Sequence, residues 1–162
     1  MSTRSFVGIV EENAIRFIYV HFDGYLTGVG QALKFGFPTI EDIKPIIDLG
    51  DREQLTLSTY AGDGKAFAEH GEPVERNVAA IYPIENGDKD KAIKQVIELA
   101  DRAGAEFLYL LDNNTWRVWH TFMQWKGQED TIPETCKADF AWQIARLAQA
   151  NRTNVKQAQP AA

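Results

Sequence analysis

Two pairs of short strand-like segments limit this chain to a fold that contains a β-sheet. The segment "TRSFVGIVEENAIRFIYVHF" has two runs rich in Val, Ile, Phe and Tyr on either side of the polar turn "EEN". The segment "AEFLYLLDNNTWRVWHTF" has the same design around Asn113-Asn114, a dipeptide suited to a tight turn with positive φ. Both segments therefore predict β-hairpins, over about residues 3–23 and 105–123.

The second run of the first hairpin has two different faces, because successive side chains of a strand point to opposite sides. One face is purely apolar and holds Ile18, Val20 and Phe22. The other face changes from apolar to polar and holds Phe17, Tyr19, His21 and Asp23. We expect the first face to meet the core and the second to run out to a polar rim.

Several segments have the period of amphipathic helices. The clearest is "NGDKDKAIKQVIELADRAG", which Asp88 can cap and Gly104 can end. The segment "PTIEDIKPIIDLG" has Thr39 as its N-cap, although Pro45 inside it is expected to kink or split the helix. A short helix near residues 29–35, capped by Thr27 or Asp23, comes before it.

A last helix is predicted over about residues 134–150, apolar at Phe140, Ile144 and Leu147. Short strands are predicted within "LTLSTY" and "VAAIYPI". The expected fold is a single α+β domain over residues 1–150, with a mostly antiparallel sheet built from the two hairpins and one or two short strands. About three helices are expected to pack on one face of that sheet. Residues 151–162 read as a disordered polar tail, and the glycine-rich segment 60–77 has no assigned role.

The charge and the cysteine content narrow the function classes. The chain of 162 residues has 17 basic and 23 acidic side chains, a formal net charge of −6. That balance argues against broad binding to nucleic acid, which needs clustered Lys and Arg. The single cysteine, Cys136, excludes an internal disulfide and any multi-cysteine metal site. No signal-peptide pattern and no run of 18 apolar residues is present, so we expect a cytoplasmic protein without a membrane partner.

The polar end of the first hairpin is the best candidate for a ligand site. A turn centred on Glu12 and Asn13 brings Arg4 opposite His21, with Asp23 on the same face. The glycines that follow begin a helix, whose free N–H groups favour anions. The candidate ligand-binding residues are Arg4, Ser5, Tyr19, His21, Asp23, Tyr25, Gly28 and Gly30. They would bind or hydrolyse a nucleotide or phosphorylated metabolite, or instead form a structural turn with an Arg–Asp pair; the sequence leaves both interpretations open.

Catalysis has little support in the sequence. There is no G-x-S-x-G, H-E-x-x-H or H-x-E with C-x-x-C motif, and "GVG" lacks the lysine and third glycine of the phosphate-binding fingerprints. His21 as a general base beside Ser5 is the one combination that chemistry would favour. We therefore expect no catalytic residues, no metal and no cofactor.

The segment "WRVWHTFMQW" is unusually aromatic. Its candidate partner-binding residues are Trp116, Trp119, Met123 and Trp125. A strand with apolar residues on both faces is typical of a buried strand, but it also fits a strand that exposes Trp and Met to a protein partner. Both interpretations stay open.

The segments "MSTRSFVGIV" and "YVHFDGYLTGVGQAL" resemble those of a set of small, largely uncharacterised accessory proteins of bacteriophages and prophages. The resemblance covers about residues 1–50 and, more loosely, the later hairpin. The matching motif positions are Ser2, Thr3, Arg4, Ser5, His21, Asp23, Gly24, Tyr25, Gly28 and Gly30. The resemblance implies no assigned reaction. It implies a protein made inside an infected bacterium that binds a host protein and interferes with a process such as antiviral defence or transcription.

Overall fold

The computed structural model describes residues 3–53, 55–57, 68–69 and 78–134. Its central element is a six-stranded sheet in the order β5-β2-β1-β6-β7-β8. In chain order these strands are β1 (Arg4–Val10), β2 (Ala14–Val20), β5 (Ala80–Pro83), β6 (Ala105–Asp112), β7 (Thr115–His120) and β8 (Glu129–Asp130). A separate two-stranded pairing joins β3 (Thr56–Leu57) to β4 (Ala68–Glu69).

Both predicted hairpins are present, and they lie side by side at the centre of the sheet. β1 and β2 pair antiparallel in the register expected for a turn after Val10. β6 and β7 pair antiparallel around Asn113 and Asn114, which have φ values of 50° and 61°. β1 and β6 pair in parallel, because α3 carries the chain from β5 across to β6. The predicted α+β fold with a mostly antiparallel sheet is therefore confirmed.

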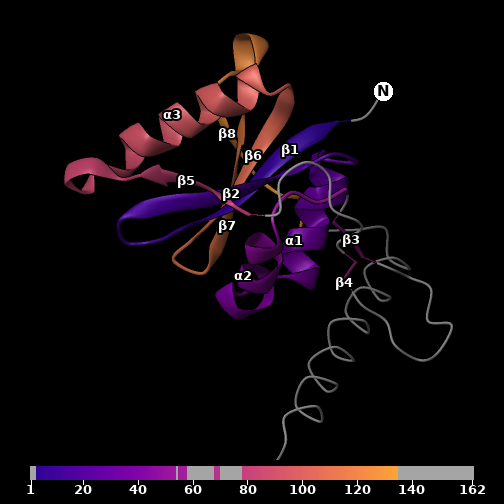
Figure 1. The fold of residues 1–162 in the computed structure, drawn as a ribbon. Helices are drawn as coiled ribbons and strands as arrows, with labels where there is room; N and C mark the ends of the chain where they lie inside the picture. The colour runs from indigo at the N-terminus through magenta and orange to yellow at the C-terminus, as the bar shows by residue number, and fades with distance from the viewer. Residues whose placement is uncertain (1–2, 54, 58–67, 70–77, 135–162) are drawn as a thin grey trace, which may run out of the picture.

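The helices cover both faces of the sheet, so the expectation of helices on one face is wrong. α3 (Lys89–Arg102) lies on one face, and α1 (Gln31–Gly36) and α2 (Ile40–Leu49) lie on the other (Figure 1). The sheet residues beneath α3 are Phe6, Ile15, Phe17, Leu108, Leu110 and Trp119. Those beneath α1 and α2 are Val7, Ile9, Ile18, Val20, Tyr109, Leu111 and Val118. Each central strand therefore buries its side chains on both sides.

The helix ends follow the predicted capping chemistry in two of three cases. Thr39 forms a capping box with Asp42, and α2 continues through Pro45 as one helix. Asp88 accepts a hydrogen bond from the Lys91 N–H at the start of α3. Neither Thr27 nor Asp23 caps the first helix by its side chain, because a five-residue π-helical turn, η1 (Leu26–Gly30), leads into α1.

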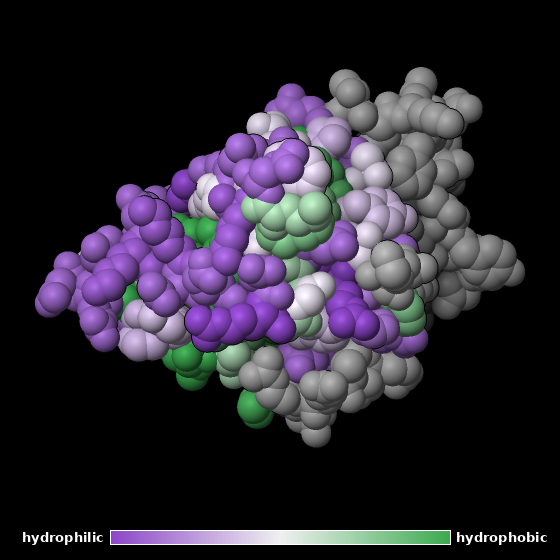
Figure 2. Space-filling model, turned by 90° about the horizontal axis from the view of Figure 1, so that it is seen from above, coloured by the Kyte–Doolittle hydropathy of each residue, from purple (hydrophilic) through white to green (hydrophobic). Residues whose placement is uncertain are grey.

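Seen from above, the surface is mainly hydrophilic, and its hydrophobic residues form small separate patches (Figure 2). Within the described ranges, no helix is both long and apolar enough to cross a membrane. The predicted helix at 134–150 except its first residue, the tail at 151–162, Cys136 and all of segment 60–77 except β4 lie outside the described residues.

Gly8 lets β1 and β2 approach closely, which gives the first prediction. A Cβ at this position would lie 2.4 Å from the Arg16 carbonyl oxygen and 2.7 Å from the Phe17 Cβ. We expect Gly8→Ala to lower the free energy of unfolding by about 1–3 kcal/mol, because both strands must shift. Urea unfolding measures this. The exposed strand position Thr115 is the control, and Thr115→Ala should stay within about 0.5 kcal/mol. Equal stability of Gly8→Ala and the control would contradict the close packing.

Candidate functional site

The predicted rim at the end of the first hairpin does not form as expected. The β1–β2 ladder stops at Ser5 and Val20, one pair before Arg4 and His21. The His21 N–H donates instead to the Arg52 carbonyl at 3.1 Å. Arg4 is exposed and pairs through its backbone with Ala105 of β6. Among the described residues, no hydrogen bond or ion pair joins Arg4 to His21 or Asp23, so the expected Arg–Asp pair is absent.

The other rim side chains bond to one another in pairs. The Tyr19 hydroxyl and the His21 Nδ1 lie 2.8 Å apart, within hydrogen-bond distance. The exposed Tyr25 hydroxyl donates to Asp23 over a long 3.4 Å, and its pKa is raised by partial burial and by the negative charge of Asp23. Asp23 itself has a φ of 58° and lies at the turn into η1. These pairs explain why polar residues gather here without requiring a ligand.

The glycines of this segment have structural reasons. A Cβ on Gly28 would lie 2.2 Å from the Asp23 carbonyl oxygen, and one on Gly24 would lie 2.9 Å from the Thr3 carbonyl oxygen. The N–H groups of Gly28 and Gly30 both donate to the Tyr25 carbonyl, at 2.9 and 3.4 Å. They are therefore not free to bind an anion, which weakens the interpretation of "GVG" as an anion cradle. A role of these residues in ligand binding stays a prediction.

Tyr109 of β6 fixes this segment to the middle of the sheet. Its side chain is fully buried, and its hydroxyl donates a 2.6 Å hydrogen bond to the Gly24 carbonyl. Burial raises the pKa of this hydroxyl well above its usual value, so it stays a donor throughout the ordinary pH range. A Cβ on Gly30 would lie only 3.2 Å from the Tyr109 ring. The Gly24–Gly30 turn is thus shaped around one tyrosine.

Ser5, the candidate nucleophile, is fully buried in the sheet. Its hydroxyl has no hydrogen-bond partner in the described part of the chain. No substrate can reach a side chain with zero exposure in this state, so the Ser5–His21 combination finds no support.

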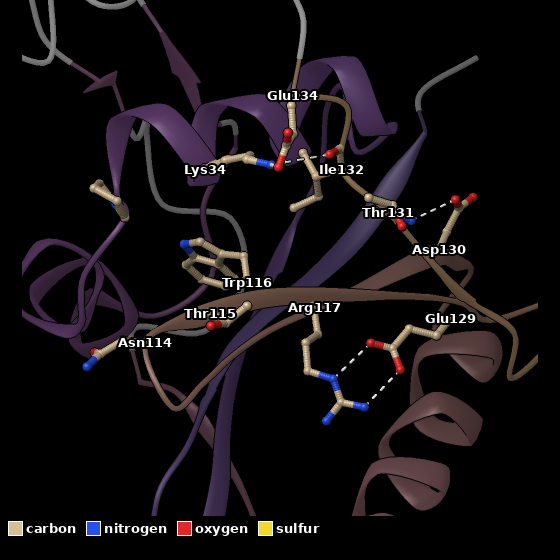
Figure 3. A pocket seen from close by; sticks show the side chains of 11 residues that line it. Lys34, Asn114, Thr115, Trp116, Arg117, Glu129, Asp130, Thr131, Ile132 and Glu134 are labelled. Atoms are coloured by element: carbon tan, nitrogen blue, oxygen red, sulfur yellow. Dashed lines mark hydrogen bonds and ion pairs between the residues drawn. The ribbon is translucent and has the colours of Figure 1, made fainter.

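A well-defined hollow lies elsewhere, beside the start of β7. It is a cleft of about 440 Å³ between β7, β8 and the end of α1. Trp116 and Ile132 line its apolar side, and Lys34, Asp130 and Glu134 add charge (Figure 3). The Trp116 indole N–H donates to the Phe37 carbonyl at 2.8 Å, which fixes the ring. The cleft therefore combines a rigid aromatic ring with carboxylates.

Ion pairs hold the two edges of this cleft together. Arg117 donates two hydrogen bonds of 2.8 Å to the Glu129 carboxylate and one of 3.0 Å to Asp112. The bidentate hydrogen bonds lower the pKa of Glu129 below its usual value and raise that of Arg117. His120 bonds Asp130 at 2.8 Å, and this bond lowers the pKa of the Asp130 carboxyl. Both carboxylates are therefore stabilised in their charged form.

The four candidate partner-binding residues fall into different environments. Trp119 is only 5% exposed and packs under α3 with the Arg117 guanidinium 4.6 Å above its ring, so it belongs to the core. Trp116 is half-buried in the cleft. Met123 and Trp125 are 67% and 40% exposed on η3 (Met123–Trp125), the turn between β7 and β8. Only these last two stand out from the surface as apolar side chains.

No family model, curated protein or solved structure matches this chain. Within the described ranges, no group of three or more His, Cys, Asp or Glu side chains is arranged to hold a metal ion.

Sequence reasoning missed the cleft because it missed β8. Glu129 and Asp130 are two charged residues with low strand propensity, so no period-2 pattern marks them. The one available signal was Arg117, a charged residue within an aromatic strand that needs an acidic neighbour. Lys34 and Glu134 are 100 positions apart in sequence, and only the fold brings them to 3.5 Å.

The Tyr109 hydrogen bond gives the second prediction. Tyr109→Phe leaves the buried Gly24 carbonyl without its partner, and we expect it to lower the free energy of unfolding by about 1–3 kcal/mol. Urea unfolding at pH 7 measures the loss. Tyr25→Phe removes the same atom from an exposed, long hydrogen bond and should change stability by no more than about 0.5 kcal/mol. If both variants lose the same amount, Tyr109 does not anchor the turn.

The Glu129 ion pair gives a third prediction, on acid stability. The folded-state pKa of Glu129 is lowered, so its contribution is complete above the ordinary carboxyl range near pH ~4 and declines as the pH falls through the lowered value. Glu129→Gln should therefore be less stable than the wild type at pH 7, and the difference should shrink on acidification. Urea unfolding between pH 7 and pH ~2.5 follows it. Gln128→Ala, exposed and uncharged, should show a constant difference; the same constant difference for Glu129→Gln would refute the ion-pair account.

Proposed function

We propose that this protein works by binding another protein rather than by catalysing a reaction. The observation that carries the proposal is the pair of exposed apolar side chains, Met123 and Trp125, on a firmly held turn. Trp and Met are enriched at protein interfaces, and Trp is a frequent hot-spot residue. The acidic net charge of −6 favours a partner with a basic surface.

The turn is organised before any partner arrives. The Gly127 N–H donates to the His120 carbonyl at 2.8 Å, and the Gln128 N–H donates to the Trp125 carbonyl at 2.9 Å. The Lys126 ammonium bonds two carboxylates of α3, Glu98 at 2.7 Å and Asp101 at 2.9 Å. A preorganised contact loses less conformational entropy on binding. These bonds support a role in recognition.

A catalytic role has less support. His21 bonds Tyr19 and His120 bonds Asp130, and neither bonds a serine, threonine or cysteine within the described residues. The alternative of a small anionic ligand at the rim is weakened by the internal hydrogen bonds of Gly28 and Gly30. The resemblance to phage accessory proteins supports a host protein as the partner. Interference with antiviral defence or transcription in a bacterial cytoplasm is the role we propose.

The fourth prediction tests the partner and the contact together. The tagged wild type should recover one protein in a stoichiometric amount from a bacterial lysate. Met123→Ser with Trp125→Ser should weaken that complex by about 2 kcal/mol or more, as removal of a hot spot does. Isothermal titration calorimetry with the purified partner measures the loss.

The matched control is Val78→Ser with Ile81→Ser, which removes two other exposed apolar side chains, one in β5 and one just before it. It should leave the affinity within about twofold of the wild type. Recovery of no stoichiometric partner contradicts the binding function, and equal loss in both double variants contradicts the turn as its contact.

A further inference from the structure

The starting half of β7 has an open edge. On one side β7 pairs with β6 along its whole length, from Thr115 to His120. On the other side β8 covers only Val118 and Trp119. The described residues thus provide no strand beside Thr115–Arg117.

The open edge presents the main chain of Trp116. His120 donates its N–H to the Gln128 carbonyl and accepts from the Gly127 N–H, both on the β8 side. In an antiparallel strand every second residue directs its N–H and C=O to the same neighbour. Val118 and Trp116 therefore face that side too. Val118 pairs with Asp130 there, whereas the Trp116 N–H and C=O have no hydrogen-bond partner among the described residues.

The cleft exists because the chain leaves the sheet after β8. Ile132 would be the next residue opposite Trp116, but its side chain is buried in the core beneath α1 and α2. The Gln31 side chain donates to the Pro133 carbonyl, and the Lys34 ammonium donates to the Ile132 carbonyl. The space left beside Trp116 is the cleft of about 440 Å³ (Figure 3). Its volume is within the range of binding pockets.

The charges of the cleft indicate what fits. A residue opposite Trp116 places its side chain on the same face as the Trp116 ring, which is also the face of Asp130, opposite Val118. The carboxylates on this face are well exposed: the side chain of Asp130 is 41% exposed and that of Glu134 is 82% exposed. Two cations also line the cleft: Lys34, 30% exposed, bonds Glu134 and Ile132, and Arg117, 29% exposed, bonds Glu129 and Asp112. A cation in the cleft would gain from the Trp116 ring and from the exposed Glu134 carboxylate, while Asp130, bonded to His120 at 2.8 Å, adds negative charge from β8.

We propose that an extended segment of a partner protein adds to β7 at Trp116 as an antiparallel strand, with a Lys or Arg side chain over the Trp116 ring in the cleft that Asp130 and Glu134 line. This inference rests on the proposed function, protein binding, and names its mode. The main-chain bonds of Trp116 set the register, and the basic side chain supplies the selectivity.

The test uses the full chain and the heptapeptide Thr-Val-Thr-Lys-Thr-Val-Thr. Fluorescence polarisation measures its affinity, and amide hydrogen exchange followed by NMR measures protection of the Trp116 N–H. We expect the lysine peptide to bind at least about tenfold more tightly than the same peptide with central Glu. N-methylation of the central amide should abolish binding. The Trp116 N–H should exchange at least about tenfold more slowly with the lysine peptide, while the bonded His120 N–H stays protected throughout.

Asp130→Asn with Glu134→Gln should weaken lysine-peptide binding by at least about tenfold. Glu12→Gln with Glu41→Gln, which changes the net charge equally far from the cleft, should stay within about twofold. Any of three results would overturn strand addition. The lysine peptide does not bind, the lysine and glutamate peptides bind equally well, or the Trp116 N–H gains no protection from exchange. A stoichiometric lysate partner that binds the Asp130/Glu134 variant at full strength leaves the proposed function standing and refutes this mode. If the peptides bind as expected but the lysate yields no stoichiometric partner, strand addition stands and the proposed function is refuted.

Discussion

The hydrogen bond from the Tyr109 hydroxyl to the Gly24 carbonyl is the constraint on which most of the site geometry depends. Tyr109 is on β6, at the parallel junction of the two hairpins, and its ring passes through the core to reach the turn before α1. Without this partner, the buried Gly24 carbonyl would lose a hydrogen bond in a place that water does not reach. The hydrogen bond therefore holds the turn close to the sheet, and in this way it fixes the position at which α1 begins.

The same contact accounts for the cleft. Gly30 lies against the Tyr109 ring, and a Cβ at Gly30 would also lie 3.6 Å from the Ile132 side chain. The next residue, Gln31, bonds the Pro133 carbonyl. The chain after β8 is thus drawn toward α1 and away from β7, and the edge of Trp116 is left open. One buried tyrosine thus links the glycines that follow the first hairpin to a cleft on the same face of the sheet.

Local patterns predicted the elements of this fold but not their arrangement. Hydrophobic alternation and the Asn113-Asn114 turn defined both hairpins, and the helical stripe with its Asp88 cap defined α3. The parallel pairing of β1 with β6 and the coverage of both faces were not predicted. The run Phe6–Ile9 is almost uniformly apolar on both faces of the strand. It therefore cannot show that the two faces pack against different helices. The pairing of strands far apart in sequence is decided by packing, which no local pattern contains.

The candidate site was also predicted only in part. The predicted hairpin register holds as far as the last ladder pair, Ser5 and Val20. His21 bonds the Arg52 carbonyl instead of continuing the ladder, so it does not pair with Arg4. The glycine-rich pattern marks these positions as conformationally unusual. The structural reason for the glycines is close contact with the Asp23 carbonyl and the Tyr109 ring, which no sequence motif connects to them. Residue type alone marks Trp116, Met123 and Trp125 as partner-binding candidates, together with Trp119. The structure distinguishes these three residues from Trp119, which is only 5% exposed.

The two edges of the sheet differ in a way that bears on recognition. β5 ends with Pro83, which has no N–H to donate and so discourages pairing with another chain. β8 is two residues long and consists of charged Glu129 and Asp130, which also protects against strand association. In contrast to these two protected edges, the open part of β7 exposes the main-chain N–H and C=O of one residue, Trp116. One residue pair of hydrogen bonds contributes only about 1–3 kcal/mol, so a segment bound there must gain most of its affinity from side chains. That requirement favours a selective partner over indiscriminate strand addition.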